Sequence, residues 1–310
     1  MCGRGIADPA SHRVGQRYFC DYHIERAHRS PGFRWSRSGL AEVLLMFVFL
    51  GVVALIWGWG EGTVLPTSML MGTVLSLIPA VVWMVYIYRQ DHIEPEPWSL
   101  VLGVFLLGGI FGYALAAPIA QDWFQIQQWQ HRAAWSPWMA AICVEATLQQ
   151  LCTYLVVRYT VYLTDEFDEP LDGVVYATAA ALGIATVTNV DFVIRHHGIL
   201  PVAGAAHIIL NSLVHVAAAA VLGYGLGRSR FAKHHGQLKL AMAFLFSILI
   251  NGGLKRTALF TGAQGGTFRP WIVLAVAALV TACVLLGIDW LSARLRRERL
   301  SLEETEVAHV

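Results

Sequence analysis

The chain has 310 residues, of which 56% are hydrophobic and only 14% are charged, and its formal net charge is +1. A soluble domain carries about 25% charged residues, so this composition excludes an ordinary soluble protein and indicates one that crosses a lipid bilayer repeatedly. The near-neutral net charge offers no support for binding to nucleic acid, and we expect no nucleic-acid partner.

The first segment, residues 1–38, is polar and rich in arginine. A cleavable signal peptide places its apolar core nearer the N-terminus, so we expect the first apolar run to direct insertion itself. Cys20 and His23 form a Cys-x-x-His half-site, to which Cys2 adds a third zinc ligand. A structural zinc ion takes four ligands, and the candidates for the fourth are His12 or another cysteine encoded upstream if translation starts earlier. The alternative is a disordered tail in which these residues are incidental.

Eight apolar runs of roughly 20 residues follow, a length that suits a membrane-spanning helix. They lie near residues 39–59, 67–88, 98–120, 137–163, 173–194, 202–226, 237–254 and 271–293. Lys and Arg gather before the first run, between the sixth and seventh, and after the last. Because cytoplasmic loops carry such an excess, both termini are predicted to be cytoplasmic. The sequence thus predicts an all-α, polytopic membrane helical bundle with about eight transmembrane helices.

Three segments follow from this pattern. A cytoplasmic N-terminal tail, 1–38, precedes a membrane bundle, 39–293, and a cytoplasmic C-terminal tail, 294–310, completes the chain. We therefore predict an integral membrane protein whose surroundings are the lipid bilayer.

A carboxylate lies inside the fourth run. Glu145 is about nine residues into that run, well below the expected membrane surface. A carboxylate at such a depth is expected to be partnered, protonated or functional. A general base is one interpretation, and a protonated glutamate hydrogen-bonded to a neighbouring helix is the other.

The sixth run carries polar residues at a helical spacing. His207, Asn211 and His215 recur every four residues, so they share one face of a helix. Histidines inside a membrane are ligands or proton carriers, or they are satisfied packing residues.

Polar groups are thus concentrated in the fourth to seventh runs, because the fifth adds Asn189 and the seventh adds Asn251. Polar residues in membrane helices face a bundle interior or a watery cavity. We predict that Glu145, Asn189, His207, His215 and Asn251 converge in one cavity.

Three spaced segments resemble the PrsW-type intramembrane peptidases, a family related to the CAAX prenyl endopeptidases. YRQDHIEPEPW carries the family's acidic residues as Asp91, Glu94 and Glu96. EPLDGVVYATAAALGIATVTNV carries its acidic-DG motif at Asp172, and LVHVAAAAVLGYGLG carries its histidine as His215. Because carboxylates are stabilised at helix N-termini, we expect Glu94 and Glu96 to orient the third span and Asp172 to cap the fifth.

The resemblance covers about residues 80–255. It implies a peptidase in which Glu145 activates water while histidine and asparagine side chains, or a metal, stabilise the oxyanion. His215, His207, Asn189 and Asn251 are the residues available for that stabilisation. The resemblance also implies a single-span membrane protein as substrate or partner, and the bacterial cytoplasmic membrane as location.

The chain departs from the family pattern at three places. The family's E-E-x-x-K reads EATLQ from Glu145, its E-N pair reads Thr188-Asn189, and its final H-x-x-x-N reads SILIN, ending at Asn251. Two histidines and one glutamate could hold a metal within the membrane, but we expect none there.

Three functions are therefore compatible with the sequence. The first is a glutamate-dependent peptidase with a degenerate site. The second is an inactive homologue that binds a membrane partner without cutting it. The third is a small-solute or proton transporter, although such proteins often show internal repeats and none is visible here.

Overall fold

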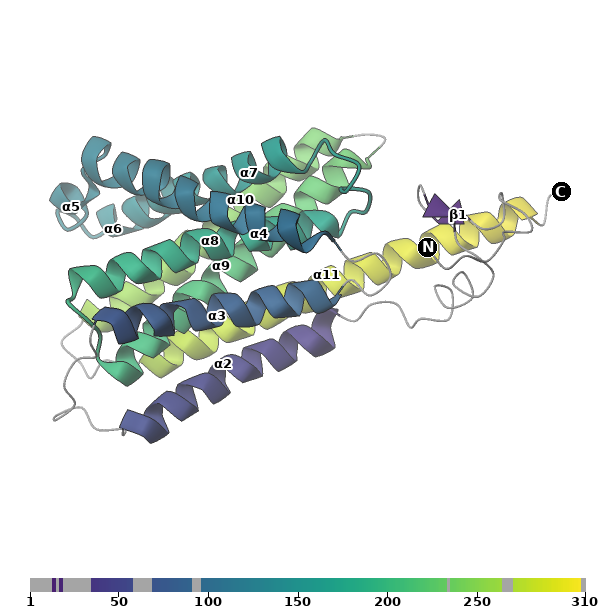
Figure 1. The fold of residues 1–310 in the computed structure, drawn as a ribbon. Helices are drawn as coiled ribbons and strands as arrows, with labels where there is room; N and C mark the ends of the chain where they lie inside the picture. The colour runs from purple at the N-terminus through teal and green to yellow at the C-terminus, as the bar shows by residue number, and fades with distance from the viewer. Residues whose placement is uncertain are drawn as a thin grey trace.

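The computed structural model describes residues 13–14, 17–18, 35–57, 69–90, 96–232, 235–263 and 270–307. Nearly all of this is helix, which confirms the predicted all-α membrane bundle (Figure 1). Two short antiparallel strands, β1 (Arg13–Val14) and β2 (Arg17–Tyr18), pair in the N-terminal segment. The proposed zinc ligands Cys2, His12, Cys20 and His23 lie outside the described residues, as do Asp91 and Glu94.

The helical elements follow one another with short connections. In chain order they are α2 (Trp35–Trp57), α3 (Met69–Gln90), α4 (Trp98–Phe111), η1 (Gly112–Ala116), η2 (Ile119–Trp123), α5 (Ile126–Trp129), α6 (Ser136–Met139), η3 (Ala140–Ala146), α7 (Thr147–Thr160), α8 (Asp172–Arg195), α9 (Pro201–Arg230), α10 (Gly236–Ala263) and α11 (Pro270–Val307). η1 and η3 are π-helical turns inside longer helices, whereas η2 ends the helix that begins with α4.

Within the described residues, 7 helical stretches are long and apolar enough to cross a membrane. They correspond to the second to eighth predicted runs. The first predicted run lies in α2, whose apolar stretch Leu40–Ile56 is shorter than the others. The predicted number of about eight spans therefore agrees with the fold, and the orientation in the membrane stays a prediction.

Two helices extend past the ends of their predicted spans. The seventh span was expected to end at residue 254, but α10 continues to Ala263, and α11 continues to Val307 through the predicted C-terminal tail. The physical reason is that an apolar window marks the part of a helix suited to hydrocarbon, whereas backbone hydrogen bonds continue into polar sequence.

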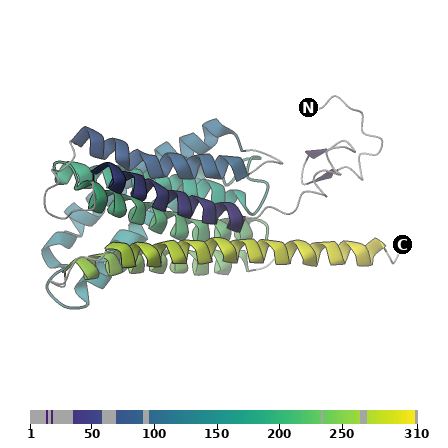
Figure 2. The ribbon, with the colours of Figure 1, turned by 90° about the horizontal axis from the view of Figure 1, so that it is seen from below.

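The two most enclosed spans, α8 and α9, lie side by side at the centre of the bundle. Figure 1 shows α4, α7 and α10 on one side of this pair and α2, α3 and α11 on the other. Figure 2 shows the C-terminal part of α11 projecting beyond the other helices. The elements that carry the predicted polar residues are η3, α8, α9 and α10, and they lie at or beside the centre of the bundle.

Small residues allow the central helices to approach closely. A Cβ atom at Gly173 of α8 would overlap the carbonyl oxygen of Gly223 in α9, and one at Gly183 would overlap that of Phe105 in α4. Close backbone approach at glycine is a common way for membrane helices to associate, since lipid supplies no hydrophobic drive between helices.

Two acidic residues at the starts of the third and fifth spans, Glu96 and Asp172, make hydrogen bonds that hold these helix starts in place. The carboxylate of Asp172 accepts a 2.6 Å hydrogen bond from the backbone N–H of Glu169, and α8 has no side-chain cap, so the prediction that Asp172 caps this helix was wrong. The carboxylate instead closes the turn before α8. Glu96 is buried and accepts a hydrogen bond from the hydroxyl of Tyr176, which fastens the start of α4 to α8.

Candidate active site

Glu145 lies in the π-helical segment η3, between α6 and α7. Such wide turns occur often at functional sites because they interrupt the regular helical hydrogen bonds. The Glu145 side chain is half-buried and, within the described part of the chain, makes no hydrogen bond or ion pair. Among the described residues, no other side chain therefore occupies the hydrogen-bonding capacity of its carboxylate.

One turn later, Gln149 connects α7 with α10. Its Oε1 atom accepts a hydrogen bond of 2.6 Å from Lys255 Nζ and one of 3.3 Å from Asn251 Nδ2. Gln149 and Asn251 are both buried, whereas Lys255 is half-buried. Asn251 and Lys255 lie four residues apart, so α10 presents both groups on the face directed at α7.

His215 of α9 adds a third helix to this cluster. It is fully buried, and its Nε2 atom lies 3.2 Å from Lys255 Nζ. A charged lysine can only donate, so Nε2 must accept and the ring proton is assigned to Nδ1. Neither His215 Nδ1 nor Asn251 Oδ1 has a hydrogen-bond partner within the described residues. Both atoms belong to residues that contact the Gln149–Lys255 pair.

The Lys255 ammonium is the charge with which the other titratable residues near this cluster interact. It interacts electrostatically with Glu145, His207 and His215. Glu145 and Lys255 remain partly exposed, while Gln149 and His215 are buried. Neutral polar groups therefore hold the lysine, and Glu145 lies near enough to interact with its charge.

Asn189 makes its contacts elsewhere along α9. Asn211 Nδ2 donates to Asn189 Oδ1 over 2.9 Å and lies 3.0 Å from Thr188 Oγ1, and Asn189 Nδ2 donates to the carbonyl oxygen of Ile208 over 3.4 Å. These bonds fasten α8 to α9. The described bonds of Asn189 do not reach Lys255, and a catalytic role for it stays a prediction.

His207 is exposed and stacks on Phe192, with 4.1 Å between the ring centroids. Phe192 also contacts the His196 ring at 4.4 Å. Among the interactions of the described residues, His207 is linked to the cluster around Glu145 only by the electrostatic effect of Lys255. His215, in contrast, contacts Lys255 directly. The two predicted histidines therefore occupy different surroundings.

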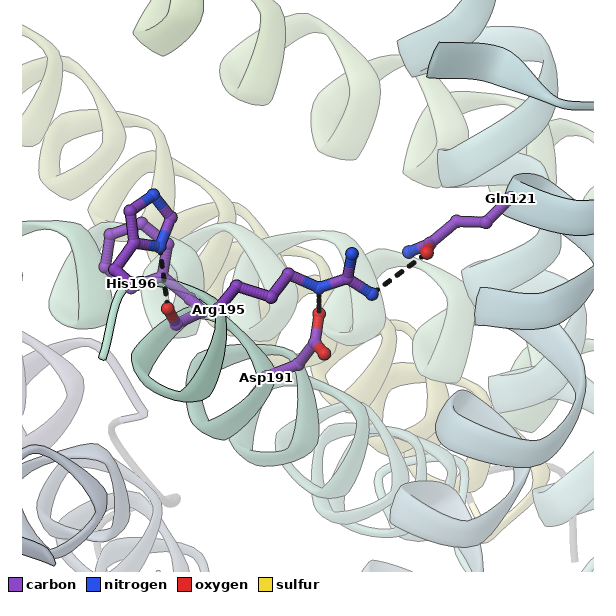
Figure 3. A network of polar contacts seen from close by, with 5 residues as sticks. Gln121, Asp191, Arg195 and His196 are labelled. Carbon is purple, nitrogen blue, oxygen red and sulfur yellow. Dashed lines mark hydrogen bonds and ion pairs between the residues drawn. The ribbon is translucent and has the colours of Figure 1, made fainter. Parts of the chain in front are cut away.

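A polar network at the end of α8 lies beside this ring stack. Arg195 Nε pairs with Asp191 Oδ2 at 2.6 Å, and Arg195 NH2 donates to Gln121 of η2 over 2.9 Å (Figure 3). The ring of His196 lies 2.7 Å from the carbonyl oxygen of Phe192. The network fixes η2 to α8 at one end of the bundle.

Lys255 is the residue of the cluster that sequence reasoning missed. The seventh predicted run ends at residue 254 and so leaves Lys255 just outside it, but α10 continues through Lys255 to Ala263. A usable signal was present, because Ser247, Asn251 and Lys255 recur every four residues.

The side chains of this cluster do not suit a metal ion. No group of three or more His, Cys, Asp and Glu side chains in the described residues is placed to hold one. His215 Nε2, the ring nitrogen nearest the centre, already faces the Lys255 ammonium. A catalytic zinc site normally has three protein ligands, and a neighbouring ammonium would repel the cation.

Comparison with known proteins agrees with this architecture. Residues 96–283 match the family described as PrsW family intramembrane metalloprotease. The chain is 32% identical to protease PrsW of Geobacillus kaustophilus over 57% of this chain and 75% of that relative. It is 25% identical to protease PrsW of Bacillus subtilis over 57% of this chain and 78% of that relative. No solved structure matches the chain. The protein, an integral membrane protein, is therefore a divergent member of the PrsW family of intramembrane proteases.

Proposed function

We propose that this protein is a Glu145-dependent peptidase that hydrolyses membrane-anchored proteins. The PrsW relatives support an intramembrane peptidase function. The observation that carries the proposal is the Glu145 carboxylate, which has no hydrogen-bond partner among the described residues and lies in the field of the Lys255 ammonium. Peptide hydrolysis needs a base to activate water and a positive or donor group for the developing oxyanion, and this cluster supplies both.

In the proposed reaction, the Glu145 carboxylate takes a proton from water while the water oxygen bonds to the scissile carbonyl carbon. The carbonyl oxygen becomes negatively charged in the tetrahedral intermediate. When the intermediate collapses, the C–N bond breaks and the proton held by Glu145 passes to the departing nitrogen. The products are a carboxylic acid and an amine, and Glu145 returns to its starting state.

The family description includes a metal, but the donor set around Glu145 does not fit one. The reaction above therefore uses only side chains of this chain. The residues that the family motif has and this chain lacks make the site degenerate relative to that motif. Glu145 still supplies a base, and Lys255, which lies outside the motif, supplies a cation.

The substrate class follows from where the site lies. Glu145 and Lys255 are both in helices long and apolar enough to span a membrane. A peptide bond reaching them must belong to a chain at the bilayer, and its helix must unwind locally there, because helical peptide bonds are shielded. We propose single-span proteins as substrates and, because the relatives are bacterial, the bacterial cytoplasmic membrane as the location.

The test is cleavage of a panel of single-span proteins by the purified protein in lipid vesicles. Glu145→Gln is expected to lower the cleavage rate by about 100-fold or more, since removing a general base costs that much. Asp165→Asn, the same change at an exposed loop carboxylate, is the matched control and should cleave like the wild type. Equal rates for Glu145→Gln and the wild type would refute the peptidase function. Stable capture of the panel without cleavage by the wild type would instead favour the inactive scaffold.

A further inference from the structure

We propose that Lys255 is a catalytic residue whose ammonium binds the scissile carbonyl oxygen and stabilises the oxyanion. This inference rests on the proposed function and extends it, because it assigns the positive group of the reaction to one side chain of α10. The positive charge at the site is then supplied by a side chain of the protein.

The first argument is the number of donors on the lysine. An ammonium has three N–H donors. Lys255 directs one at Gln149 Oε1, 2.6 Å away, and one at His215 Nε2, 3.2 Å away. The third has no partner within the described residues, and the residue as a whole is partly exposed. One donor is thus left for an oxygen that approaches the ammonium.

The second argument is that the position of the ammonium is fixed in advance. Gln149 is buried and is itself held by Asn251, and His215 is fully buried. These neutral acceptors determine where Nζ lies without neutralising its charge. A preorganised charge in a site with little water stabilises a developing oxyanion strongly, since no reorganisation is needed during the reaction.

The third argument concerns the alternative that Lys255 is only a counter-ion for Glu145. A positive charge inside a membrane protein is costly, and direct pairing with a carboxylate would offset that cost. Glu145 and Lys255 interact electrostatically, yet they form no direct ion pair within the described part of the chain. The two groups thus interact through space without direct contact, so neither neutralises the other as a paired counter-ion would.

In the reaction, Lys255 keeps its proton throughout. Water gives its proton to Glu145 as the new C–O bond forms, and the electron pair of the carbonyl π bond moves to the oxygen facing Lys255. On collapse, this pair re-forms the carbonyl bond, the C–N bond breaks, and the nitrogen takes the proton from Glu145. The ammonium contributes attraction to the oxyanion and is unchanged at the end.

The experiment compares Lys255→Gln, Lys255→Arg and the exchange variant Lys255→Gln/Gln149→Lys in lipid vesicles. Lys255→Gln should lower kcat by about 100-fold with little change in KM, because the oxyanion exists only in the transition state. Lys255→Arg and the exchange variant should recover part of the loss, since each restores a cation in the same group. Lys239→Gln, on the exposed part of α10, is the control and should behave like the wild type.

A second measurement does not depend on turnover. A peptide phosphinate carries a tetrahedral anionic centre, so it should bind Lys255→Gln about 100-fold more weakly than the wild type, whereas the matching uncleaved peptide should bind both equally. Equal phosphinate binding, or a kcat loss matched by loss of folded protein in thermal unfolding, would refute the role of Lys255. Loss of activity in Glu145→Gln with full activity in Lys255→Gln would refute this inference alone, while full activity in Glu145→Gln would refute the proposed function.

Discussion

Gly252 of α10 lies directly against Ile142 of η3, three residues before Glu145. A Cβ atom at Gly252 would lie 2.7 Å from Ile142 Cα and 2.9 Å from the carbonyl oxygen of Ala141. The glycine therefore allows α10, with Asn251 and Lys255, to approach the helix that carries the base. The distance between base and cation depends on this contact.

Gly252→Ala is expected to destabilise the protein by about 1–3 kcal/mol, the usual cost of overpacking, and to reduce cleavage by moving α10 away from η3. The adjacent Gly253 has nothing within 4 Å of its hypothetical Cβ atom, so Gly253→Ala is the matched control. The control should be neutral or slightly stabilising because alanine favours helix more than glycine does. Thermal unfolding in detergent and cleavage in vesicles measure the two effects. Identical behaviour of the two variants would contradict the close contact.

The two histidines of α9 are expected to differ in importance. His215→Phe removes the Nε2 acceptor that holds Lys255, so cleavage should fall by at least about 10-fold, as for loss of a group that positions a reacting residue. His207→Phe keeps a ring that can stack on Phe192 and should retain most activity. Steady-state cleavage by folded protein of each variant distinguishes them. A larger loss for His207→Phe than for His215→Phe would reverse this assignment.

The bonds between Asn189 and Asn211 are expected to matter for stability. Asn211→Leu removes the donor to Asn189 Oδ1 and Thr188 Oγ1, and should cost about 1 kcal/mol, typical of hydrogen bonds between membrane helices. Thr73→Val removes a hydrogen bond within its own helix and serves as control. Unfolding of both variants in mixed micelles measures the difference. An unfolding free energy for Asn211→Leu equal to that of the wild type would show that these bonds contribute nothing.

Zinc binding by the N-terminal tail remains a proposal based on its residue types. If Cys2, Cys20, His23 and His12 hold zinc, the purified full chain should contain about one zinc ion, and Cys20→Ser should lower that content. Cys143→Ser, in η3, should leave it unchanged. Metal analysis of the three proteins gives the answer, and equal zinc in Cys20→Ser and the wild type would exclude this ligand set.

The fold class was predictable from local sequence, because the length and apolarity of a run decide whether a helix suits hydrocarbon. The same windows misjudged the end of α10, since Lys255 and Arg256 end the apolar run without ending the helix. The role of Asp172 was misjudged for a related reason. An aspartate at a helix start commonly accepts a hydrogen bond from the first N–H groups of the helix, but the Asp172 carboxylate accepts one from the N–H of Glu169, which precedes it.

The sequence by itself determined the helical membrane bundle and the resemblance to PrsW peptidases, and it pointed to Glu145, His215 and Asn251. Only the tertiary structure decided which side chains meet at the cluster. Lys255 reaches Gln149 across 106 residues of chain and His215 across 40. In the sequence, Lys255 marks the end of an apolar run. Burying its charge inside the bundle costs less only where other helices supply hydrogen-bond acceptors, and the residues near Lys255 in the sequence do not include those acceptors.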